Sequence, residues 1–597
     1  MSGSQNRSCC NIIYRLGLNI VMLLTLLLSI LLFAGSFLTT CYADNMETQQ
    51  VLLRPDNPLW NLLELAGFGL LFCGCLYLYA KIGERFRRGL LVFTLTFVFV
   101  LGVLLILFGR TVPAADALSV YNAAAEWILG NTDIIHPTAS YLSYYPQQIG
   151  LMAFLELLLR LWNLTGLSAP AWHFIKLVYV CLLCVAIWFQ YLSLQYLWPE
   201  NYKKISCCYL ILVCCNLPMI MYSSFVYGEI PSFAALSLGW YLLLRLLGNV
   251  SLGSASLDSA SLSSASPGSV SPGSVSPGSV SLGSVSLGSA SPGSASLDSS
   301  YRDNVSRNDA PSVTAHMLCR IIFTGFGSIL FLTLSVMLRK NSLIPVIAVL
   351  LVLLFEALRP GRNGKMRLGL LIMAVCLAVT SVNVLPLTQK IYEKKAGNTL
   401  SSGVTAMSYL AMGMQEASRG CGWYNGFNID TYDAAGMDTA LANEISRLAI
   451  DERLAYFREH PGYTADFYLH KHLSQWADGT YASRQATLAT YGGRSSFFKE
   501  VYEGSLSGGY IEWCNAWQNV LYLGMLVFCI DSLKKRRESR VADRLYVYVG
   551  LIAVLGGFLF HTFWEANSRY IFSYSLLLMP YCGAGVYTLL LPKRGHR

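Results

Sequence analysis

Four short polar groups border the long apolar runs of this chain, and they are the places where chemistry could occur. The first group opens with Asp116 and ends in a tyrosine- and amide-rich stretch. That stretch contains Tyr144, Tyr145 and Gln147. Ionisable groups beside apolar segments are costly, so their positions carry functional information. A carboxylate can remove a proton from a hydroxyl, and aromatic and amide side chains suit the faces and hydroxyls of sugars.

Asp116 also has a purely structural interpretation. An aspartate at this position could be the N-cap of a helix over about 117–128, where its side chain would accept a backbone hydrogen bond. Residue type and spacing alone leave both interpretations open.

Glu229 belongs to the second group, Tyr227-Gly228-Glu229-Ile230-Pro231. Its carboxylate could cap the helix that follows, because a helix N-terminus favours an anion. It could equally face Asp116 across a cavity. The sequence leaves this choice open as well.

The third and fourth groups contain cations. Arg339 and Lys340 stand together between two apolar runs, where they suit a lipid phosphate or extend towards lipid headgroups. Glu565 and Arg569 lie four residues apart and could pair with each other.

The composition identifies the kind of protein that positions these groups. Of 597 residues, 54% are hydrophobic and 13% are charged, against roughly 25% charged in a soluble chain. Apolar runs of about 20 residues recur along the whole sequence, as in transmembrane helices. These features exclude a soluble enzyme, a disordered chain, a secreted disulfide scaffold and an outer-membrane barrel. We expect an all-α polytopic membrane protein, with about 12–13 transmembrane helices and a small extracytoplasmic helical lobe.

The apolar runs give the candidate spans, which are 16–40, 59–80, 89–109, 171–195, 205–222, 232–248, 319–337, 343–359, 367–387, 517–532, 545–563 and 571–591. A further run at 149–162 is too short to cross a membrane comfortably. If it is re-entrant or interfacial, the basic clusters between spans all fall on one side, together with both termini. The positive-inside rule makes that side cytoplasmic. The net charge of +9 then reflects topology in the lipid bilayer, and we expect no nucleic-acid partner.

The spans divide the chain into seven segments. We expect N-terminal spans in 1–109, a first extracytoplasmic loop in 110–170, spans in 171–248, a disordered Ser/Gly/Pro-rich cytoplasmic linker in 249–318, spans in 319–387, an extracytoplasmic helical lobe in 388–516 and C-terminal spans in 517–597. Helical periodicity in the lobe predicts helices over about 437–459 and 463–476. All four polar groups lie on the extracytoplasmic side in this topology.

Cofactor motifs are absent from the sequence. The 17 cysteines lie mostly in apolar runs and show no metal-ligand spacing, so we expect neither a metal site nor another cofactor. Cys421 and Cys514 are the two cysteines of the late lobe, and a disulfide between them is one possibility.

The order of these motifs resembles the GT-C superfamily of integral-membrane glycosyltransferases. The resemblance rests on the loop aspartate, Tyr144-Tyr145-Pro146 before a short apolar helix, Tyr227-Gly228-Glu229-Ile230-Pro231, Arg339-Lys340-Asn341 and Ser568-Arg569-Tyr570-Ile571-Phe572. Lys471 to Gln475-Trp476 is a looser match. Within the superfamily, the sequence is most similar to the bacterial family-39 branch, which includes protein O-mannosyltransferases and the lipid A aminoarabinose transferase. The likeness covers roughly 90–250 and 319–590.

The resemblance implies a reaction and roles for the residues. The donor would be a polyprenyl-phosphate-linked sugar, and the acceptor an extracytoplasmic cell-envelope glycan, lipid or protein. Asp116 would be the catalytic base, and Arg339 and Lys340 would bind the donor phosphate. Some relatives carry two acidic residues in the loop motif where this chain has Ala115 before Asp116, and we expect no metal requirement.

We also expect Tyr144, Tyr145, Gln147, Glu229 and Arg569 to contact sugar or acceptor. Two other classes remain as alternatives. A polysaccharide polymerase or ligase would use polyprenyl-diphosphate glycans and external basic residues, for which Arg419, Arg447, His470 and His472 are candidates. A lipid-linked sugar transporter would instead place its polar groups near the bilayer midplane.

Overall fold

The computed structural model describes residues 2–43, 50–138, 140–262, 310–359, 362–487, 495–537 and 544–590. These residues are mostly helical, with two short two-stranded sheets. The chain divides into a larger unit, Met1–Leu244 with Gly327–Arg597, and a smaller unit, Arg245–Phe326. Every candidate functional residue lies in the larger unit.

Ten helices of the described part are long and apolar enough to cross a membrane. These spans are Ile12–Leu38, Pro58–Ile82, Glu84–Gly109, Ala171–Leu197, Glu229–Gly248, Ile321–Leu338, Lys340–Leu358, Gly364–Ala396, Ser507–Arg536 and Leu545–Phe563. They confirm the expected multi-pass helical fold. They belong to α1 (Ser2–Leu38), α2 (Pro58–Ile82), α3 with η1 (Glu84–Leu104, Leu105–Gly109), α7 (Ala171–Leu197), α10 (Glu229–Leu262), α11 (Ala310–Leu338), η3 with α12 (Lys340–Ser342, Leu343–Leu358), α13 (Gly364–Ala396), α20 (Ser507–Arg537) and η4 with α21 (Leu545–Tyr548, Val549–Phe563).

The other two expected spans, 205–222 and 571–591, are not among these ten helices. The run 205–222 is broken into α8 (Tyr202–Cys215) and α9 (Leu217–Tyr222). Asn216 causes the break, because its side chain accepts a hydrogen bond from Met219 N at 3.1 Å and caps α9. The run 571–591 is one helix, α22 (Ser568–Leu590), but its tyrosines, glycines and Pro580 make it less apolar than the ten spans.

The short run after Tyr145 forms a helix of its own. It consists of η2 (Pro146–Gln148) and α6 (Ile149–Asn163). With 15 residues, α6 is about 22 Å long, which is shorter than the apolar core of a bilayer. A Cβ atom on Gly150 would lie 2.1 Å from the carbonyl oxygen of Met337. Only glycine therefore allows α6 to pack this closely against α11.

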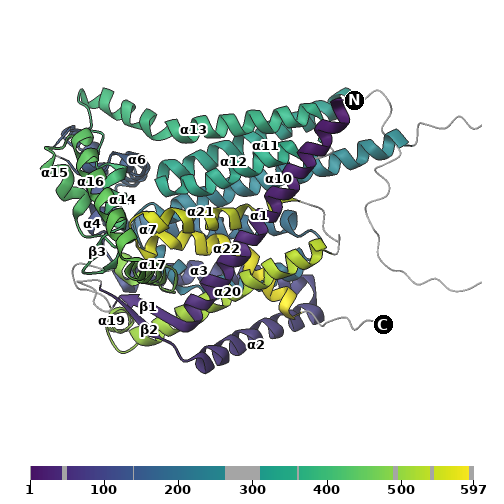
Figure 1. Ribbon diagram of the computed structural model, residues 1–597, viewed down its shortest axis with the longest axis horizontal. Coiled ribbons are helices and arrows are strands. Elements are labelled where there is room, and N and C mark those ends of the chain that lie inside the picture. Colours follow the sequence, from purple (N-terminus) through teal and green to yellow (C-terminus); the bar gives the residue numbers. More distant parts are fainter. Residues whose placement is uncertain are drawn as a thin grey trace, which may run out of the picture. The chain divides into compact units, whose positions relative to one another are not determined.

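The segment 388–516 contains the expected helices. Its elements are α14 (Ala406–Gly413), β3 (Glu416–Ala417), β4 (Gly420–Cys421), α15 (Phe427–Ala434), α16 (Thr439–Glu459), α17 (Pro461–Trp476), α18 (Ser483–Ala486) and α19 (Ser496–Tyr502). The helices predicted over 437–459 and 463–476 correspond to α16 and α17. Figure 1 shows α14, α15 and α16 gathered together, at the same end of the helices as α4 (Ala115–Ile128) and α6.

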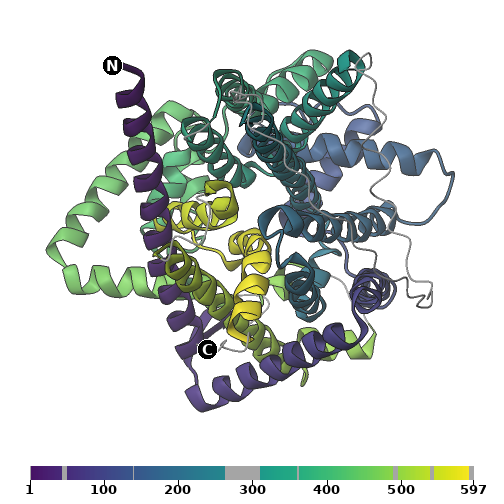
Figure 2. The ribbon, with the colours of Figure 1, turned by 90° about the vertical axis from the view of Figure 1, so that its right-hand side faces the viewer.

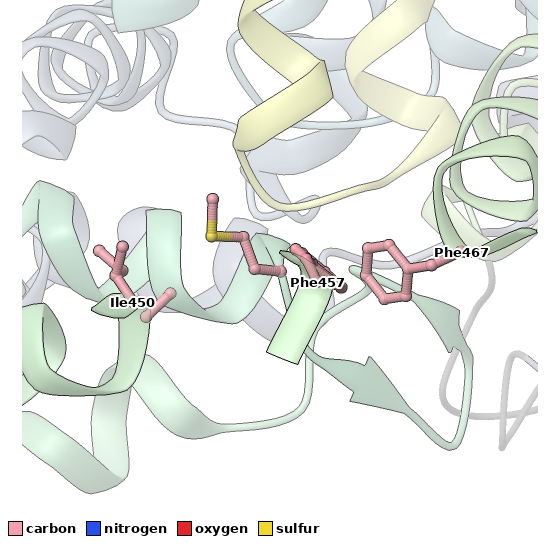
Figure 3. Close-up of a cluster of buried hydrophobic side chains, with 5 residues drawn as sticks. Ile450, Phe457 and Phe467 are labelled. Atoms are coloured by element: carbon pink, nitrogen blue, oxygen red, sulfur yellow. The ribbon is translucent and has the colours of Figure 1, made fainter. Parts of the chain in front are cut away.

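A small apolar core holds this lobe together. Figure 3 shows its side chains, with Phe457 of α16 beside Phe467 of α17. The two ring centroids are 5.3 Å apart, which suits a favourable aromatic pair. Ile450, Met414 and Ala411 complete the cluster. The lobe therefore has its own buried apolar surface in addition to its contacts with the other helices.

An antiparallel hairpin that the sequence analysis did not predict joins the first two spans. It pairs β1 (Thr39–Ala43) with β2 (Val51–Pro55). Backbone hydrogen bonds attach it to the lobe, from Cys41 N to Ala477 O at 3.0 Å and from Val51 N to Arg419 O at 2.9 Å.

The C-terminal helix α22 forms much of the interior. It packs against α20, α8 and α21, and Figure 2 shows the yellow C-terminal helices among the others. A Cβ atom on Gly585 would lie 1.9 Å from Gly524 O. This close approach of α22 and α20 is typical of membrane helices, whose interfaces are rich in small residues.

Two further expectations concern the cysteines and the linker. Cys421 and Cys514 are both free thiols, so the possible disulfide is wrong. Cys514 is packed among Met221, Tyr502 and Tyr510, whereas Cys421 packs against the lobe core. For the linker expected over 249–318, helices extend to Leu262 and begin again at Ala310, and its central part, 263–309, lies outside the described residues.

Candidate active site

Asp116 lies in the first turn of α4, where the chain has just left a membrane span. The N-cap of α4 is Ala114, which has no side-chain cap. Asp116 is therefore not the capping residue, and that structural interpretation is wrong. The residue before it, Ala115, has φ +49°, a left-handed conformation that is strained for alanine. Backbone strain of this kind is concentrated at functional sites.

The Asp116 carboxylate is half-buried and makes no hydrogen bond or ion pair within the described ranges. Several tyrosines lie within reach of its charge, among them Tyr141, Tyr145 and Tyr227. Burial raises the pKa of Tyr145 above its ordinary value, and the charge of Asp116 adds to the rise. The same two causes raise the pKa of Tyr227. For Tyr141, burial, Tyr227 and Asp116 raise the pKa in that order.

These tyrosines come from separate segments that hydrogen bonds hold together. Tyr141 belongs to α5 (Tyr141–Tyr144), and its ring centroid is 5.0 Å from that of Tyr145. Gln148 donates a hydrogen bond to the Tyr227 hydroxyl, which links the start of α6 to the loop before α10. Asp116 is therefore within electrostatic reach of a group of tyrosines from two separate segments.

The turn between α21 and α22 contributes Glu565, and the first turn of α22 contributes Arg569. The guanidinium of Arg569 lies 5.6 Å from the ring centroid of Tyr227 and 5.8 Å from that of Phe225. Glu565 is buried and accepts a hydrogen bond from the Tyr570 hydroxyl at 3.2 Å. The possible ion pair between Glu565 and Arg569 is not formed.

Glu565 titrates unusually for a carboxylic acid. Burial raises its pKa to about 7, the nearby charge of Arg569 opposes the rise, and that of Asp116 adds to it. Asp116, Glu565 and Arg569 thus influence one another electrostatically, although Asp116 is distant in sequence from the other two.

Glu229 and Arg339 form a buried ion pair beside this group. Arg339 Nη2 lies 3.3 Å from Glu229 Oε1, and the two side chains are 9% and 1% exposed. Arg339 Nη1 also donates to Ser573 Oγ at 3.3 Å. Glu229 therefore faces Arg339 and is not paired with Asp116. The neighbouring Lys340 is exposed.

A pocket opens against Arg339. It lies between the start of α10, the turn 339–345 and the first turns of α22, and its lining includes Ser232, Phe233, Asn341, Tyr570, Ser573 and Tyr574. Hydroxyl, amide and aromatic groups around one guanidinium are side chains of the kind that bind an anionic headgroup.

Tyr144 and Gln147 occupy different surroundings from Asp116. The Tyr144 hydroxyl donates to Asp433 Oδ1 at 2.7 Å, and its ring packs edge-on against Tyr432 at 5.7 Å. These contacts attach the loop to α15. Gln147 is half-buried, and the neighbouring Gln148 makes the bond to Tyr227. Their sugar contacts stay predictions.

Tyr141, Gln148 and Tyr227 were not predicted as site residues, although Tyr227 begins a quoted motif and the other two border Tyr144 to Gln147. Gln148 offers the same amide chemistry as Gln147, and only the helical register at the start of α6 distinguishes them. Tyr227 could have been predicted from the sequence, because it directly precedes the candidate residue Glu229 in the motif Tyr227-Gly228-Glu229.

The basic residues of the late lobe have local partners. Arg447 lies 4.0 Å from Asp451, and His470 lies 3.2 Å from Asp466. The guanidinium of Arg419 lies over the Tyr424 ring. Burial lowers the pKa of His472 to about 4, so its imidazole is neutral near pH 7. Among the described residues, no group of three or more His, Cys, Asp or Glu could hold a metal ion.

Comparison with known proteins identifies no family for this chain. No family model matches the sequence, and no curated protein matches it. Among solved structures, the fold has a distant similarity to the apo form of the oligosaccharyltransferase of Archaeoglobus fulgidus, with 12% sequence identity and a TM-score of 0.41. The match covers 85% of this chain and 51% of that one, so the chain spans about half the length of the archaeal protein.

Proposed function

We propose that this membrane protein is an inverting glycosyltransferase that moves a sugar from a polyprenyl-phosphate carrier to an extracytoplasmic acceptor. The observation that carries the proposal is the position of Asp116. Its carboxylate lies in the first turn of α4, within electrostatic reach of Tyr145, Tyr227 and Arg569. The resemblance of the sequence motifs to GT-C enzymes supports the same reaction class.

The reaction requires one base and one site for the leaving phosphate. Asp116 accepts the proton of the acceptor hydroxyl as its oxygen attacks the anomeric carbon. The bond from that carbon to the phosphate oxygen breaks, and its electron pair leaves with the lipid phosphate. Attack from the opposite face inverts the anomeric configuration. This route needs one carboxylate, in contrast to the paired carboxylates of most glycosidases.

The pocket at Arg339 is our candidate for the donor phosphate. Arg339 lines this pocket and pairs with the buried Glu229, and Arg569, next to the lining residue Tyr570, is within electrostatic reach of Glu229 and Asp116. The exposed Lys340 would add its charge at the rim. Stabilisation of developing negative charge by such cations is a major source of catalysis.

The topology is part of the proposal. With α6 lying at the membrane surface, the basic clusters between spans and both termini fall on the cytoplasmic side. Asp116, the tyrosines and the pocket at Arg339 then face the extracytoplasmic side. The expected location is the plasma membrane.

The test replaces Asp116 with asparagine, which keeps the shape of the side chain and removes the base. Membranes containing either protein receive a polyprenyl-phosphate sugar, and donor consumption and glycosylated product are measured. We expect Asp116→Asn to lose at least about a hundredfold in rate. Asp133→Asn is the matched control, because Asp133 is exposed in the same loop.

Two results would count against the proposal. Equal rates for wild type and Asp116→Asn would remove the aspartate from the mechanism. A wild type that leaves a panel of monophosphate-linked donors untouched but consumes diphosphate-linked glycans would favour the polymerase alternative.

A further inference from the structure

A buried lysine contacts the turn that leads to Asp116. Lys176 belongs to α7 and is 0% exposed. Its ammonium group donates to the backbone carbonyl of Thr111 and, at 2.8 Å, to the Thr111 hydroxyl. No carboxylate of the described residues pairs with it. An ammonium group that is held inside a membrane protein by two neutral oxygens is costly, and such residues are candidates for a functional role.

The turn that Lys176 contacts has a strained backbone. Residues 110–114 connect η1 to α4 and belong to no helix or strand. Arg110 at the start has φ +47°, and Ala115 at the end has φ +49°. Left-handed conformations of non-glycine residues persist where the surrounding structure enforces them. Apart from bonds within the helices, the hydrogen bonds to 110–113 in the described part of the chain both come from Lys176, so Lys176 is the polar group that can enforce this turn.

A second contact of α7 lies on the other side of Asp116. Trp172, four residues before Lys176, packs against Tyr121 of α4, with ring centroids 6.0 Å apart and ring planes at 67°. Residues four apart lie on the same face of a helix. One face of α7 therefore contacts the chain five residues before Asp116, at Thr111, and five residues after it, at Tyr121.

We propose that Lys176 is a positioning residue, which fixes the turn at Thr111 and thereby holds the Asp116 carboxylate within reach of the acceptor hydroxyl. The assignment rests on the proposed glycosyltransferase function and adds to it a residue that acts through Asp116. Placement matters because a base must lie within hydrogen-bond reach of the proton that it removes. A displacement of about 1 Å can cost on the order of a hundredfold in rate.

The test measures the turnover of a radiolabelled polyprenyl-phosphate sugar by the full-length protein in native membranes, which supply the acceptor. Lys176→Met keeps the length of the side chain and removes its hydrogen-bond donors. We expect kcat to fall at least about tenfold, whereas the KM for the donor stays within about twofold, because the turn is disturbed and no substrate contact is lost. Leu177→Met is the matched control, since it places the same residue at a 40% exposed position of α7, and its kinetics should equal those of wild type. Size-exclusion profiles verify folding.

A double-variant cycle separates positioning from a purely structural role. In Asp116→Asn the base is absent, so the addition of Lys176→Met should change the residual rate by less than about twofold. A purely structural role would lower the rate by the same factor with and without the aspartate. Thr111→Val keeps the shape of the side chain and removes one acceptor, so it should lower kcat about threefold or more and leave the donor KM unchanged. If Lys176→Met does not fold, Thr111→Val takes its place in the cycle.

Three results would overturn the positioning role. They are an unchanged kcat in the folded variant, a raised donor KM with an unchanged kcat, and an equal loss of rate with and without Asp116. In each case a loss of rate in Asp116→Asn alone would still support the proposed function. Equal rates for wild type and Asp116→Asn, or a wild type without turnover, would overturn both.

Discussion

The buried ion pair between Glu229 and Arg339 allows a quantitative test of the fold around the site. Glu229→Gln removes the negative charge and keeps the size of the side chain, so Arg339 loses its ionic partner while it remains 9% exposed. At a separation of 3.3 Å and an effective dielectric constant near 20, the direct attraction is about 5 kcal/mol.

Desolvation of both charges offsets much of that attraction, but the cost of breaking the pair is asymmetric. Removing one partner leaves a buried charge without compensation, which costs roughly 3–5 kcal/mol. We therefore expect Glu229→Gln to lower the free energy of unfolding by about this amount. Replacing both partners with uncharged residues of similar volume should restore most of the loss, because no buried charge then remains.

The assay is denaturant unfolding in mixed micelles, applied to wild type, Glu229→Gln, Arg339→Gln and the double variant. Lys340→Gln is the control, since Lys340 is the exposed neighbour and its replacement should change stability by no more than about 0.5 kcal/mol. A loss below about 1 kcal/mol in Glu229→Gln, or a double variant as unstable as the sum of the single ones, would refute the reasoning.

Three further predictions concern single groups of the same unit. The folded pKa of Glu565, about 7, lies above its unfolded value, so its contribution to stability falls as pH rises from about 4.5 to 7. The expected loss of unfolding free energy is on the order of 3 kcal/mol. Glu565→Gln should remove this pH dependence when unfolding is compared at pH 5 and pH 8. Burial lowers the pKa of Lys471 to about 7. The free energy of unfolding should therefore rise with pH from about 7 towards 10. Lys471→Met should abolish that rise when unfolding is compared at pH 7 and pH 9. Ala115→Gly should keep or raise the melting temperature, because glycine adopts φ +49° without strain. Ala124→Gly, in the interior of α4, should instead lower the free energy of unfolding by about 1 kcal/mol or more. The opposite order would show that Ala115 is not strained.

Most of the helices could be predicted because their signals are local. The apolar run 171–195 corresponds to α7, Ala171–Leu197, and the periodic stretch 437–459 corresponds to α16, Thr439–Glu459. The break at Asn216 was also readable, since an asparagine followed two residues later by Pro218 is typical of a helix start. The hairpin could not be predicted from local sequence, because its two short strands are defined by their pairing with each other and by their hydrogen bonds to the lobe.

The site could be predicted only in part, since its geometry depends on contacts between distant segments. Residue type alone identified Asp116 as a candidate base. The pairing of Glu229 with Arg339 joins residues that are far apart in the sequence, and no local pattern reports it. For the same reason Glu565 and Arg569 looked like an ion pair at helical spacing, whereas Glu565 in fact precedes the helix and accepts from Tyr570.

The hairpin between the first two spans has a mechanical consequence. Its strands are bonded to each other and, through Cys41 N and Val51 N, to the backbone at Ala477 and Arg419. A movement that lifts this side of the lobe must either break these two backbone bonds, at about 1 kcal/mol each, or carry the ends of α1 and α2 with it. The lobe is thus coupled to two helices anchored in the bilayer, and a force that tilts those helices is transmitted to the lobe backbone at Ala477 and Arg419.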